Sequence, residues 1–293
     1  MLSVLIPTYN YNILPLTEVL LGQCLKANLV FEIIVADDGP GRPTAQTNKA
    51  VAQLPYCRFI ENTTNLGRTL TRKNLAEAAQ YNNLLFLDAD VMPADEQFIE
   101  RYVPYLNGSI AVVVGGYAYR HYPADNNHRL RLKYGISREQ KTASERNKNP
   151  YGSIFSGNFL IDKSTFLQNN YPDNHNYYGM DIYFSYSLFI KKTAVVHIDN
   201  PIYHLGLESD AVFFKKSMES VKIRKQLLAH KEGIGQVNSL IKHYNTLKKL
   251  HLAGLATLAF KVTEPLLKKM IFKKDPNLFC MDLYRLGYIC SLK

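Results

Sequence analysis

Two aspartates stand two residues apart, directly after an apolar run of strand length. The run is Leu-Leu-Phe-Leu at residues 84–87, and Asp88 and Asp90 follow it before Pro93. A buried strand that presents Asp-x-Asp at its end can hold a divalent metal against a phosphate. Magnesium and manganese favour carboxylate oxygens and complete their shells with water and substrate phosphates. We therefore expect these aspartates to hold Mn²⁺ or Mg²⁺ and a phosphate-bearing ligand.

Two further polar clusters follow predicted strands nearer the N-terminus. Thr-Tyr-Asn at residues 8–10 comes after the strand-like run 3–7, and Asp37 and Asp38 come after the run 31–35. Strand, loop and helix repeat at spacings of roughly 25–30 residues, which predicts a parallel sheet with right-handed crossovers. Open sheets of this kind bind ligands at the carboxyl ends of their strands. The three clusters are therefore expected at one edge of one sheet.

The next part of the chain is less regular. Strand-like runs cover residues 110–116 and 194–198, ordered structure resumes over 155–161, and a loop that enters a helix is expected over 177–190. Residues 121–152 hold seven Lys and Arg against three Asp and Glu, with little apolar periodicity, and we expect a long loop there. Such a loop could close over a bound diphosphate, or it could simply be solvated.

Positive charge is concentrated at the C-terminal end. Residues 1–210 hold 19 Lys and Arg against 20 Asp and Glu, whereas residues 211–293 hold 16 against 5. This difference predicts a near-neutral globular domain over 1–210 that is followed by a basic extension. The basic extension over 211–293 is expected to meet an anionic partner.

The extension has a helical pattern, and one part of it is amphipathic. The uncharged run 250–260 is too short to span a bilayer, which needs about 20 residues. A helix lying on a membrane surface and a helix covering the chain's own domain both fit the pattern. A polar stripe separates apolar faces at helical spacing: Gly254, Thr257, Lys261, Glu264 and Lys268.

The cysteines and the N-terminus indicate the compartment. Cys24, Cys57, Cys280 and Cys290 show neither close pairing nor metal-ligand spacing, so a reducing environment is the default. The N-terminus enters a strand-like run at once, without the features of a signal peptide. We expect a cytoplasmic protein that could associate peripherally with the inner face of the cell membrane.

Four short segments stand in a recognisable order. They are Ser-Val-Leu-Ile-Pro-Thr-Tyr-Asn at 3–10, Ile-Ile-Val-Ala-Asp-Asp-Gly at 33–39, Asn-Leu-Gly at 65–67 with Arg-Lys-Asn at 72–74, and Leu-Asp-Ala-Asp at 87–90. Together they resemble the family 2 glycosyltransferases of the GT-A fold, and the match covers roughly residues 1–210. The resemblance implies a nucleotide-sugar half over about 1–115 and an acceptor half over about 116–210. The resemblance implies an α/β fold with a Rossmann-like, mostly parallel sheet flanked by helices, followed here by the C-terminal helical extension.

The resemblance also implies a nucleotide-sugar site. Asp38 would accept the imide N–H of uracil, Arg72 would lie near the base or diphosphate, and Asp88 would contact the ribose or a metal-bound water. Asp90 would bind the metal. A turn with a helix cap is the alternative for residues 37–39. The residues implied for nucleotide-sugar binding are Pro7, Thr8, Tyr9, Asp38, Arg72, Asp88 and Ala89.

Two later segments, 157–160 and 178–184, resemble the acceptor half of the family. Where relatives usually show Gly-Glu-Asp, Met180 replaces the glutamate and Asp181 keeps the aspartate. An inverting transfer needs a base for the acceptor hydroxyl, and Asp181 is the candidate. A helix-capping aspartate is the alternative. The loss of the glutamate removes its hydrogen bonds to the acceptor.

Two histidines are given different roles. His204, in Tyr-His-Leu-Gly at 203–206, resembles the histidine that completes the metal site in many relatives, and neutral imidazole is a common metal ligand. A structural histidine is the alternative. His197 lies on an apolar strand-like run, and we expect it to be buried and hydrogen-bonded.

The expected function is transfer of a sugar, with inversion, from a nucleotide-sugar to a hydroxyl of a glycan or lipid-linked acceptor. A UDP-sugar is the expected donor, and cell-surface polysaccharide assembly is the expected process. A nucleotidyltransferase is one alternative, but residues 8–12 lack the Gly-rich, basic loop typical of that class. A non-catalytic protein that binds anionic surfaces is another. No nucleic-acid partner is expected, because no helix-turn-helix, zinc or aromatic RNA-binding signature is present.

Overall fold

The computed structural model describes residues 1–120, 127–172 and 177–293. The chain forms two compact units. The first comprises Met1–Ala118, Lys141–Asn176 and Lys191–Gly206, and the second comprises Tyr119–Gln140, Tyr177–Ile190 and Leu207–Lys293. Residues 119–140 and 177–190 therefore group with the C-terminal extension, although they precede it in the sequence.

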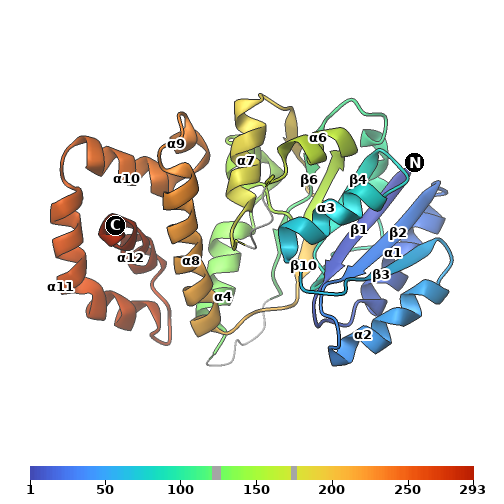
Figure 1. Ribbon diagram of the computed structural model, residues 1–293, viewed down its shortest axis with the longest axis horizontal. Coiled ribbons are helices and arrows are strands. Elements are labelled where there is room, and N and C mark those ends of the chain that lie inside the picture. Colours follow the sequence, from blue (N-terminus) through green and yellow to red (C-terminus); the bar gives the residue numbers. More distant parts are fainter. Residues whose placement is uncertain (121–126, 173–176) are drawn as a thin grey trace. The chain divides into compact units, whose positions relative to one another are not determined.

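Within the described residues, a seven-stranded sheet in the order β3-β2-β1-β4-β8-β6-β9 forms the centre of the first unit (Figure 1). Strands β1 to β4 run parallel, and β8 runs antiparallel to β4 and β6. The expected mostly parallel α/β sheet is confirmed. Its strands are β1 (Leu2–Thr8), β2 (Phe31–Asp37), β3 (Cys57–Glu61), β4 (Asn83–Leu87), β6 (Val112–Val114), β8 (Asn158–Asp162) and β9 (Val195–His197).

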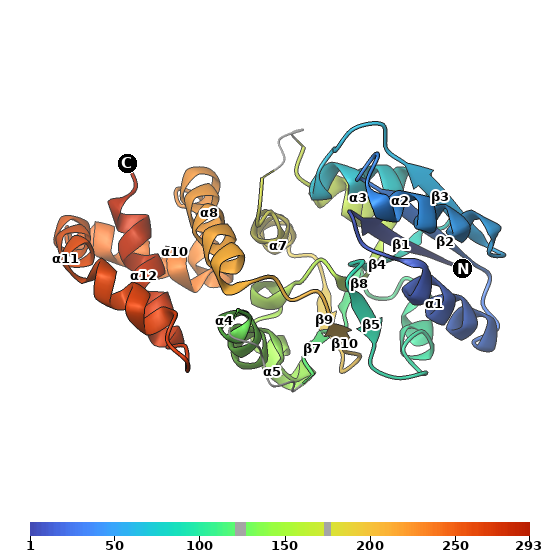
Figure 2. The same cartoon turned by 90° about the horizontal axis from the view of Figure 1, so that it is seen from below.

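Strands β1 and β2 lie inside the sheet, between β3 and β4, and are apolar on both faces. Val4 and Leu5 of β1 pair with Ile33 and Ile34 of β2, and all four side chains are fully buried. Continuous apolar runs of this kind are typical of parallel strands covered by helices on both sides. Helices α1 (Leu14–Lys26) and α3 (Arg68–Ala78) lie on opposite faces of the sheet (Figure 2).

A second, three-stranded sheet brings distant segments together beside β4. It has the order β5-β10-β7, with β5 at Val91–Pro93, β7 at Tyr117–Ala118 and β10 at Ile202–His204. His204 lies opposite Val91 in the antiparallel β5–β10 pair. This pairing places the His204 side chain next to Asp90, which directly precedes β5.

The remaining elements of the first unit are short. They are α2 (Pro43–Asn48), η1 (Lys49–Gln53), η2 (Glu100–Tyr105), α5 (Ala143–Asn147), η4 (Pro150–Ser153) and α6 (Lys163–Asn169). The second unit is helical in its described part. Its elements are α4 (Arg129–Tyr134), η3 (Gly135–Glu139), α7 (Asp181–Ile190), α8 (Asp210–Leu228), α9 (Ile234–Val237), α10 (Ser239–Lys249), α11 (Ala253–Ile271) and α12 (Leu278–Ser291).

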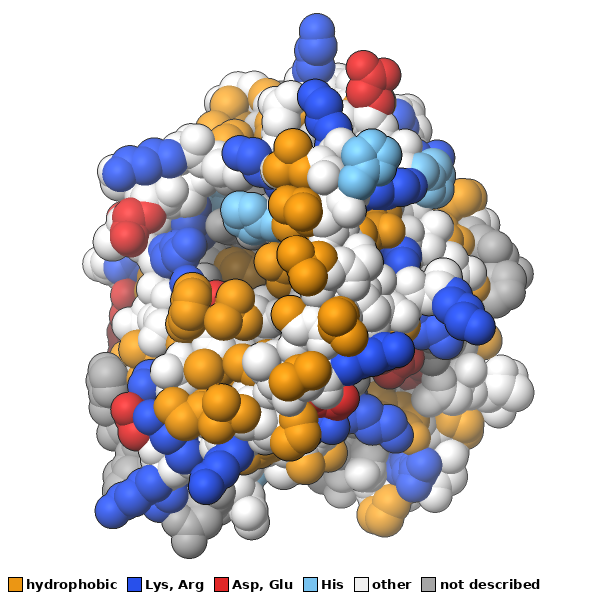
Figure 3. All heavy atoms as spheres, turned by 90° about the vertical axis from the view of Figure 1, so that its left-hand side faces the viewer, with side chains coloured by type: hydrophobic (Ala, Val, Ile, Leu, Met, Phe, Trp, Pro, Cys, Tyr) orange, Lys and Arg blue, Asp and Glu red, His pale blue; other side chains and the backbone are white. Residues whose placement is uncertain are grey.

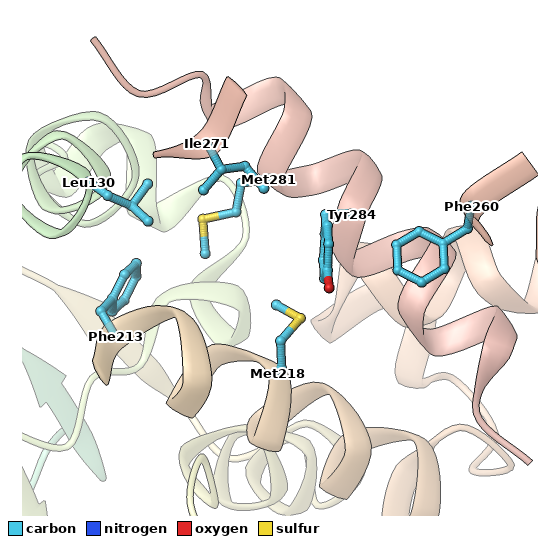
Figure 4. Packing of buried hydrophobic residues seen from close by; sticks show 7 residues of the cluster. All are labelled: Leu130, Phe213, Met218, Phe260, Ile271, Met281 and Tyr284. Carbon is cyan, nitrogen blue, oxygen red and sulfur yellow. The ribbon is translucent and has the colours of Figure 1, made fainter. Parts of the chain in front are cut away.

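The helices of the second unit share a hydrophobic core. Figure 4 shows Met218 of α8 facing Tyr284 and Met281 of α12, with Phe260 of α11 beside Tyr284. Leu130 of α4 joins the same cluster and is fully buried. The extension therefore packs around residues from before position 140.

The prediction of a long loop over residues 121–152 is wrong for residues 127–152, the part that the structure describes. Residues 127–152 form α4, η3, α5 and the start of η4, whereas 121–126 lie outside the described residues. These helices are too short to show periodicity, and short helices depend on tertiary contacts. The Asp210 carboxylate accepts the N–H of Arg131 at 2.9 Å, and Thr142 and Glu145 form a capping box on α5.

Helix α11 has one buried and one exposed apolar side. Phe260 and Ile271 are buried, and Glu264 of the predicted stripe accepts a hydrogen bond from Tyr284 of α12 at 2.8 Å. The opposite side of the helix exposes leucines. No helix in the described ranges has both the length and the apolar character that crossing a membrane would require.

Candidate active site at the carboxyl edge of the central sheet

The predicted polar clusters follow neighbouring parallel strands. Thr8, at the end of β1, pairs with Asp37 at the end of β2, and β1 also pairs in parallel with β4. Asp88 directly follows β4. The first unit therefore gathers these clusters at one edge of its sheet, where open α/β sheets bind ligands.

Asp37 serves the local turn. Its side chain is fully buried, and its two carboxylate oxygens accept hydrogen bonds from the Gly39 N–H at 2.9 Å and the Asn48 side-chain amide at 3.0 Å. These contacts join the end of β2 to α2. The turn interpretation therefore applies to Asp37.

Asp38 is held by several donors. Its Oδ1 accepts from the Asn62 amide at 2.9 Å and from the Leu66 N–H at 2.7 Å, and its Oδ2 accepts from the Gly67 N–H at 2.7 Å. Gly67 has a φ of +80°, a conformation that favours glycine, and α3 begins at the next residue. Asp38 thus fixes the turn that orients α3 and its arginines.

The loop after β1 exposes an aromatic ring. Thr8 is buried, and its hydroxyl donates to the Tyr11 carbonyl at 3.2 Å, while Pro7 pairs with Ala36 of β2. Tyr9 is 48% exposed, with the Arg42 guanidinium 5.5 Å from its ring centroid and donating to its hydroxyl at 2.8 Å. A half-exposed ring with a nearby cation provides a surface on which a planar ligand can stack.

Asp88 is buried among cations. The Arg72 guanidinium is hydrogen-bonded to Asp88 Oδ1, Arg68 lies 3.5 Å from the same oxygen, and the Tyr117 hydroxyl donates to Oδ2 at 3.3 Å. Burial by itself would raise the pKa of Asp88, but the charges of Arg68 and Arg72 outweigh it and hold that pKa below its usual range. Asp88 is therefore a carboxylate with its charge already paired.

Gly157 makes room for this cluster. A side-chain carbon at Gly157 would collide with the Tyr117 hydroxyl and the Asp88 carboxylate. The Gly157 carbonyl also accepts the N–H of Asp88 at 3.2 Å. The first of the two predicted acceptor segments, 157–160, thus supports the Asp88 position, with Asn158–Asp162 as strand β8 beside β4.

Asp90 has the opposite electrostatic character. Its side chain is 28% exposed and has no arginine within ion-pair distance among the described residues. Burial raises its pKa, the neighbouring Asp88 charge adds to this, and His204 and Arg68 offset it in part. The pKa of Tyr11 is raised by burial and by the Asp90 charge, which places Tyr11 near the same carboxylate.

Asp90 and His204 fit one divalent ion. Asp90 Oδ2 and His204 Nε2 are 3.6 Å apart, too far for a hydrogen bond. Two ligands that each lie about 2.1 Å from one Mg²⁺ are separated by about 3 to 4 Å, which matches this distance. Nowhere in the described ranges do three His, Cys, Asp or Glu side chains come together as a metal site. Water and diphosphate oxygens would have to complete the shell.

The backbone around Asp90 is also constrained. Its carbonyl accepts the N–H groups of Leu205 at 2.8 Å and Gly206 at 3.3 Å. A side-chain carbon at Gly206 would collide with the Asp90 carboxylate. The segment after β10 therefore packs against Asp90, and Ala89, half-buried, separates the two aspartates.

Asp181 belongs to the second unit. It is the first residue of α7, after Gly179 with a φ of +83° and the buried Met180. A side-chain carbon at Gly179 would collide with the Ser220 hydroxyl of α8. The charge of Asp181 acts on Arg224 of α8. Because Met180 is buried, its side chain takes a packing role at the position of the family glutamate.

The sequence did not identify Arg68 or Tyr117. Arg68 precedes Arg72 by four residues, so the helical spacing could have placed both on one face of α3. Tyr117 depends on β7, a two-residue strand without a periodic signal. The prediction for His197 is confirmed, because it is buried and bonded to Arg146 Nε at 3.2 Å and to the Pro150 carbonyl at 2.8 Å.

Comparison with known proteins agrees with this geometry. The model of the family described as glycosyl transferase family 2 matches residues 3–166, which run from the second residue of β1 to beyond β8. No curated protein matches the chain.

Solved structures share the fold at low sequence identity. The mannosyltransferase PcManGT from Pyrobaculum calidifontis, in complex with GDP-Man and Mn²⁺, has a TM-score of 0.63 and 15% identity, over 98% of this chain and 85% of that chain. Residues 1–349 of S. aureus TarS have a TM-score of 0.52 and 14% identity, over 98% of this chain and 90% of that chain. The TarS complex with UDP-GlcNAc has the same TM-score and identity, over 99% and 90%.

The family model covers more than half of the sequence, including both aspartates after β4, and the solved relatives share the mostly parallel sheet. The chain therefore belongs to glycosyl transferase family 2 and is a glycosyltransferase with the GT-A fold.

Proposed function

We propose that this glycosyltransferase transfers a sugar with inversion from a UDP-sugar to a hydroxyl group of a glycan or lipid-linked acceptor. The observation that carries the proposal is the cluster of Asp90 and His204 beside Asp88, Arg68 and Arg72. It combines two metal ligands with two cations, a set suited to a nucleoside diphosphate. The GDP-Man and UDP-GlcNAc complexes of the solved relatives support a donor of this class.

Asp38 and Tyr9 are the residues we assign to the base. The contacts from the turn at 62–67 hold the Asp38 carboxylate rigidly, and Oδ2 accepts one hydrogen bond from the described residues. A carboxylate oxygen can accept a second bond, such as one from the imide N–H of uracil. Tyr9 would stack on the ring, with Pro7 and Thr8 shaping the loop.

Asp88 and the arginines would position the rest of the donor. Asp88, already a paired carboxylate, would accept a hydrogen bond from a ribose hydroxyl or a metal-bound water. Arg72 and Arg68 would lie beside the diphosphate, and their positive charges would partly offset its negative charge. Asp90 and His204 would hold Mn²⁺ or Mg²⁺, which when bound would stabilise the charge that develops on the leaving diphosphate.

Asp181 is the proposed base of the transfer. In a single displacement the acceptor oxygen bonds to the anomeric carbon, the bond from that carbon to the diphosphate oxygen breaks, and UDP leaves with the bonding electrons. Asp181 takes the hydroxyl proton. The buried Met180 offers the acceptor no hydrogen bond, so other groups must position it.

The test of this proposal is donor turnover. Purified protein would be incubated with UDP-, GDP- and TDP-sugars, with Mn²⁺ or with EDTA, and released nucleotide measured. We expect metal-dependent turnover of a UDP-sugar, and about a 100- to 10,000-fold loss in Asp181→Asn. Glu219→Gln, an exposed carboxylate of the same unit, is the control. Turnover of the GDP- or TDP-sugar alone would contradict the assignment of the base, and undiminished turnover in Asp181→Asn would contradict its catalytic role.

The alternatives are disfavoured. Family membership supports an enzyme rather than a non-catalytic anion-binding protein. It also supports sugar transfer rather than nucleotidyl transfer, in agreement with the absence of a Gly-rich basic loop at residues 8–12.

The second unit presents a surface that we assign to an anionic membrane. Leu255, Leu258, Val262 and Leu266 of α11 are 61–75% exposed and recur at helical spacing opposite the buried Phe260. Figure 3 shows hydrophobic side chains gathered on this face with Lys and Arg side chains around them. Exposed leucines bordered by lysines are typical of helices that lie at the surface of anionic lipid. The lysines on and beside this helix are Lys248, Lys249, Lys261, Lys268, Lys269, Lys273 and Lys274.

A membrane-carried acceptor fits this surface. An intermediate of cell-surface polysaccharide assembly, built on a lipid at the inner face of the membrane, would meet an enzyme bound there peripherally. We therefore propose that the apolar face of α11 keeps the enzyme near its acceptor, in addition to the extension's packing role inside the second unit.

A further inference from the structure

Two arginines of the second unit are near enough for the charge of one to act on the other. Arg224 is on α8 and Arg285 is on α12, two helices that pack against each other through Met218, Val221, Tyr284 and neighbouring core residues. The Nε atoms of both arginines are buried and have no hydrogen-bond partner. Arginine guanidinium groups are normally paired when they are taken out of water.

The available partners are weak. Arg285 donates to the Tyr134 hydroxyl at 3.4 Å, and its distance to Asp282 is 4.0 Å. Asp282 is engaged more closely by Arg138, at 2.6 Å. In the described part of the chain, the Arg224 guanidinium makes no hydrogen bond and no ion pair. Both arginines therefore keep a buried Nε without a partner, although the Arg224 side chain as a whole is only half-buried.

The electrostatic effect is visible at Arg224. Burial, followed by the charge of Arg285, lowers the pKa of Arg224 to about 10. Tyr134, Asp181 and Tyr178 oppose this lowering without reversing it. A pair of like charges that depress each other in this way would be relieved by an anion bound between them.

A hydroxyl donor stands on the same helix face. Ser220 precedes Arg224 by four residues on α8, so the two side chains are neighbours, and the buried Ser220 Oγ also has no partner in the described residues. Two guanidinium groups and a hydroxyl make a donor set without an acceptor. Arginine forks and hydroxyl groups are the usual ligands of phosphate oxygens.

We infer that Arg224 and Arg285, with the Ser220 hydroxyl, bind a phosphate group of the acceptor. The inference rests on the proposed function and adds the acceptor's chemical class, an alcohol that also carries a phosphate ester or diphosphate. The charge of Asp181 reaches Arg224, so the anion site lies near the proposed base. A phosphate held there would direct an acceptor hydroxyl toward Asp181 and replace the contacts that the family glutamate would have made.

The test uses inorganic pyrophosphate as the probe and thermal unfolding of the full chain as the readout, with EDTA present so that no metal retains pyrophosphate at the donor site. Wild type should be stabilised by pyrophosphate. Arg224→Gln should bind it about 10- to 100-fold more weakly, as expected for the loss of a charge-assisted hydrogen bond. Lys222→Gln, an exposed cation of the same helix, should bind it like wild type.

The stability of the free proteins separates a binding role from a structural one. Without pyrophosphate, Arg224→Gln should unfold at the same temperature as wild type or at a higher one, because it removes a partly buried cation that the charge of Arg285 repels. A lower unfolding temperature, or unchanged pyrophosphate affinity, would overturn the inference. Arg285→Lys keeps the charge and loses the planar fork, so it should bind pyrophosphate with intermediate affinity.

Further ligands identify the kind of molecule that carries the phosphate and separate a failure of this inference from a failure of the donor proposal. Octyl phosphate represents a lipid-linked acceptor, and diglycerol phosphate, a phosphodiester, represents a phosphodiester polymer. The ligand that binds more tightly identifies the source. Stabilisation by UDP with Mn²⁺ should be the same in Arg224→Gln and wild type. If this stabilisation also fell in Arg224→Gln, the arginines would serve the donor and the inference would be wrong. If wild type bound pyrophosphate here but never UDP with Mn²⁺, the donor proposal alone would fail.

Discussion

The sheet edge of the first unit and the α8–α12 region of the second unit balance charge in opposite ways. At the sheet edge, Asp88 is surrounded by Arg68, Arg72 and Tyr117, and Asp38 accepts three hydrogen bonds. In the second unit, Arg224 makes no hydrogen bond or ion pair with the described residues, and its Nε is buried. The carboxylates of the first region are balanced by groups of the chain itself, whereas the arginines of the second region need a bound anion to balance them.

One residue at the sheet edge departs from this rule. Asp90 lies two residues from Asp88, yet its pKa is shifted upward by burial and by the Asp88 charge, while that of Asp88 is shifted downward by arginines. Asp90 therefore resembles Arg224 in carrying a charge that its surroundings do not balance. The charge of Asp90 is negative, so it needs a bound cation. Asp88 and Asp38 are thus held by donors of the chain before any ligand binds, whereas Asp90 and Arg224 keep a charge that the described residues compensate only in part.

The largest effect is expected at Asp90. Asp90→Asn removes the charged metal ligand, so kcat/KM for the donor should fall about 1000-fold, the effect of several kcal/mol of lost charge stabilisation. Glu96→Gln, an 88% exposed carboxylate of the same unit, should leave it unchanged. Initial-rate measurements would check this, and an Asp90→Asn enzyme within twofold of wild type would remove Asp90 from the metal site.

The next effect distinguishes paired from unpaired arginines. Arg72→Met breaks the buried contact with Asp88 and should lower the free energy of unfolding by about 3–5 kcal/mol. The loss should lie near the lower value, because Arg68 remains beside Asp88 in the variant. Arg224→Met should leave that energy unchanged or raise it. Urea unfolding would measure both, and equal losses would mean that the two regions do not differ.

The exposed face of α11 gives a binding effect. Replacing Leu258 and Val262 together by Asp should weaken binding to vesicles containing anionic lipid about 100-fold, because two apolar side chains no longer enter the lipid. The same exchange at Val212, which is 44% exposed on α8, is the control. If vesicle sedimentation showed undiminished binding, α11 would have no part in membrane association.

Gly157 tests how tightly the Asp88 cluster is packed. Gly157→Ala would push a methyl group against Asp88 and Tyr117, which should cost about 1–3 kcal/mol of stability. Gly22→Ala meets no atom within 4 Å on α1 and should be neutral or stabilise by about 1 kcal/mol or less. Thermal unfolding would compare the two variants. A Gly157→Ala variant as stable as Gly22→Ala would show that Asp88 and Tyr117 can move aside at little cost in stability.

The smallest effect is on the pH dependence of stability. Asp88 has a lower pKa in the folded chain, so its contribution is present above its unfolded pKa of about 4 and is lost as the pH falls through the folded-state value. Asp90 has a raised pKa, so without metal its ionisation reduces stability as the pH rises through that value. Metal-free Asp90→Asn should therefore exceed wild type in stability at neutral pH and lose the advantage in acid, as measured by urea unfolding. A variant less stable than wild type at neutral pH would contradict this sign.

Much of the first unit could be predicted from the sequence. The strands over 3–7, 31–35 and 84–87 are apolar and end at polar residues, so periodicity alone placed Asp38, Asp88 and Asp90 at strand ends. The partners of those residues were harder to find. Tyr117 reaches Asp88 from a two-residue strand, and Arg68 is identified by helical spacing only once Arg72 is known.

The second unit could be predicted less well for a physical reason. Both sides of α11 are apolar, so the sequence cannot tell that Phe260 is buried while Leu258 is exposed; contacts with α12 decide it. The short helices within 127–152 depend on partners such as Asp210, far away in the sequence. Arg224 and Arg285 are 61 positions apart and lack any motif, so only packing reveals them as a pair.

The most direct measurement is the stabilisation of the full chain by UDP and Mn²⁺, separately and together. Because the diphosphate would complete the shell of an ion held by Asp90 and His204, the two ligands together should raise the unfolding temperature by more than the sum of their separate effects. That excess should vanish in Asp90→Asn and persist in Glu96→Gln. Purely additive effects in wild type, or the same excess in Asp90→Asn, would contradict a metal-assisted nucleotide site at this sheet edge.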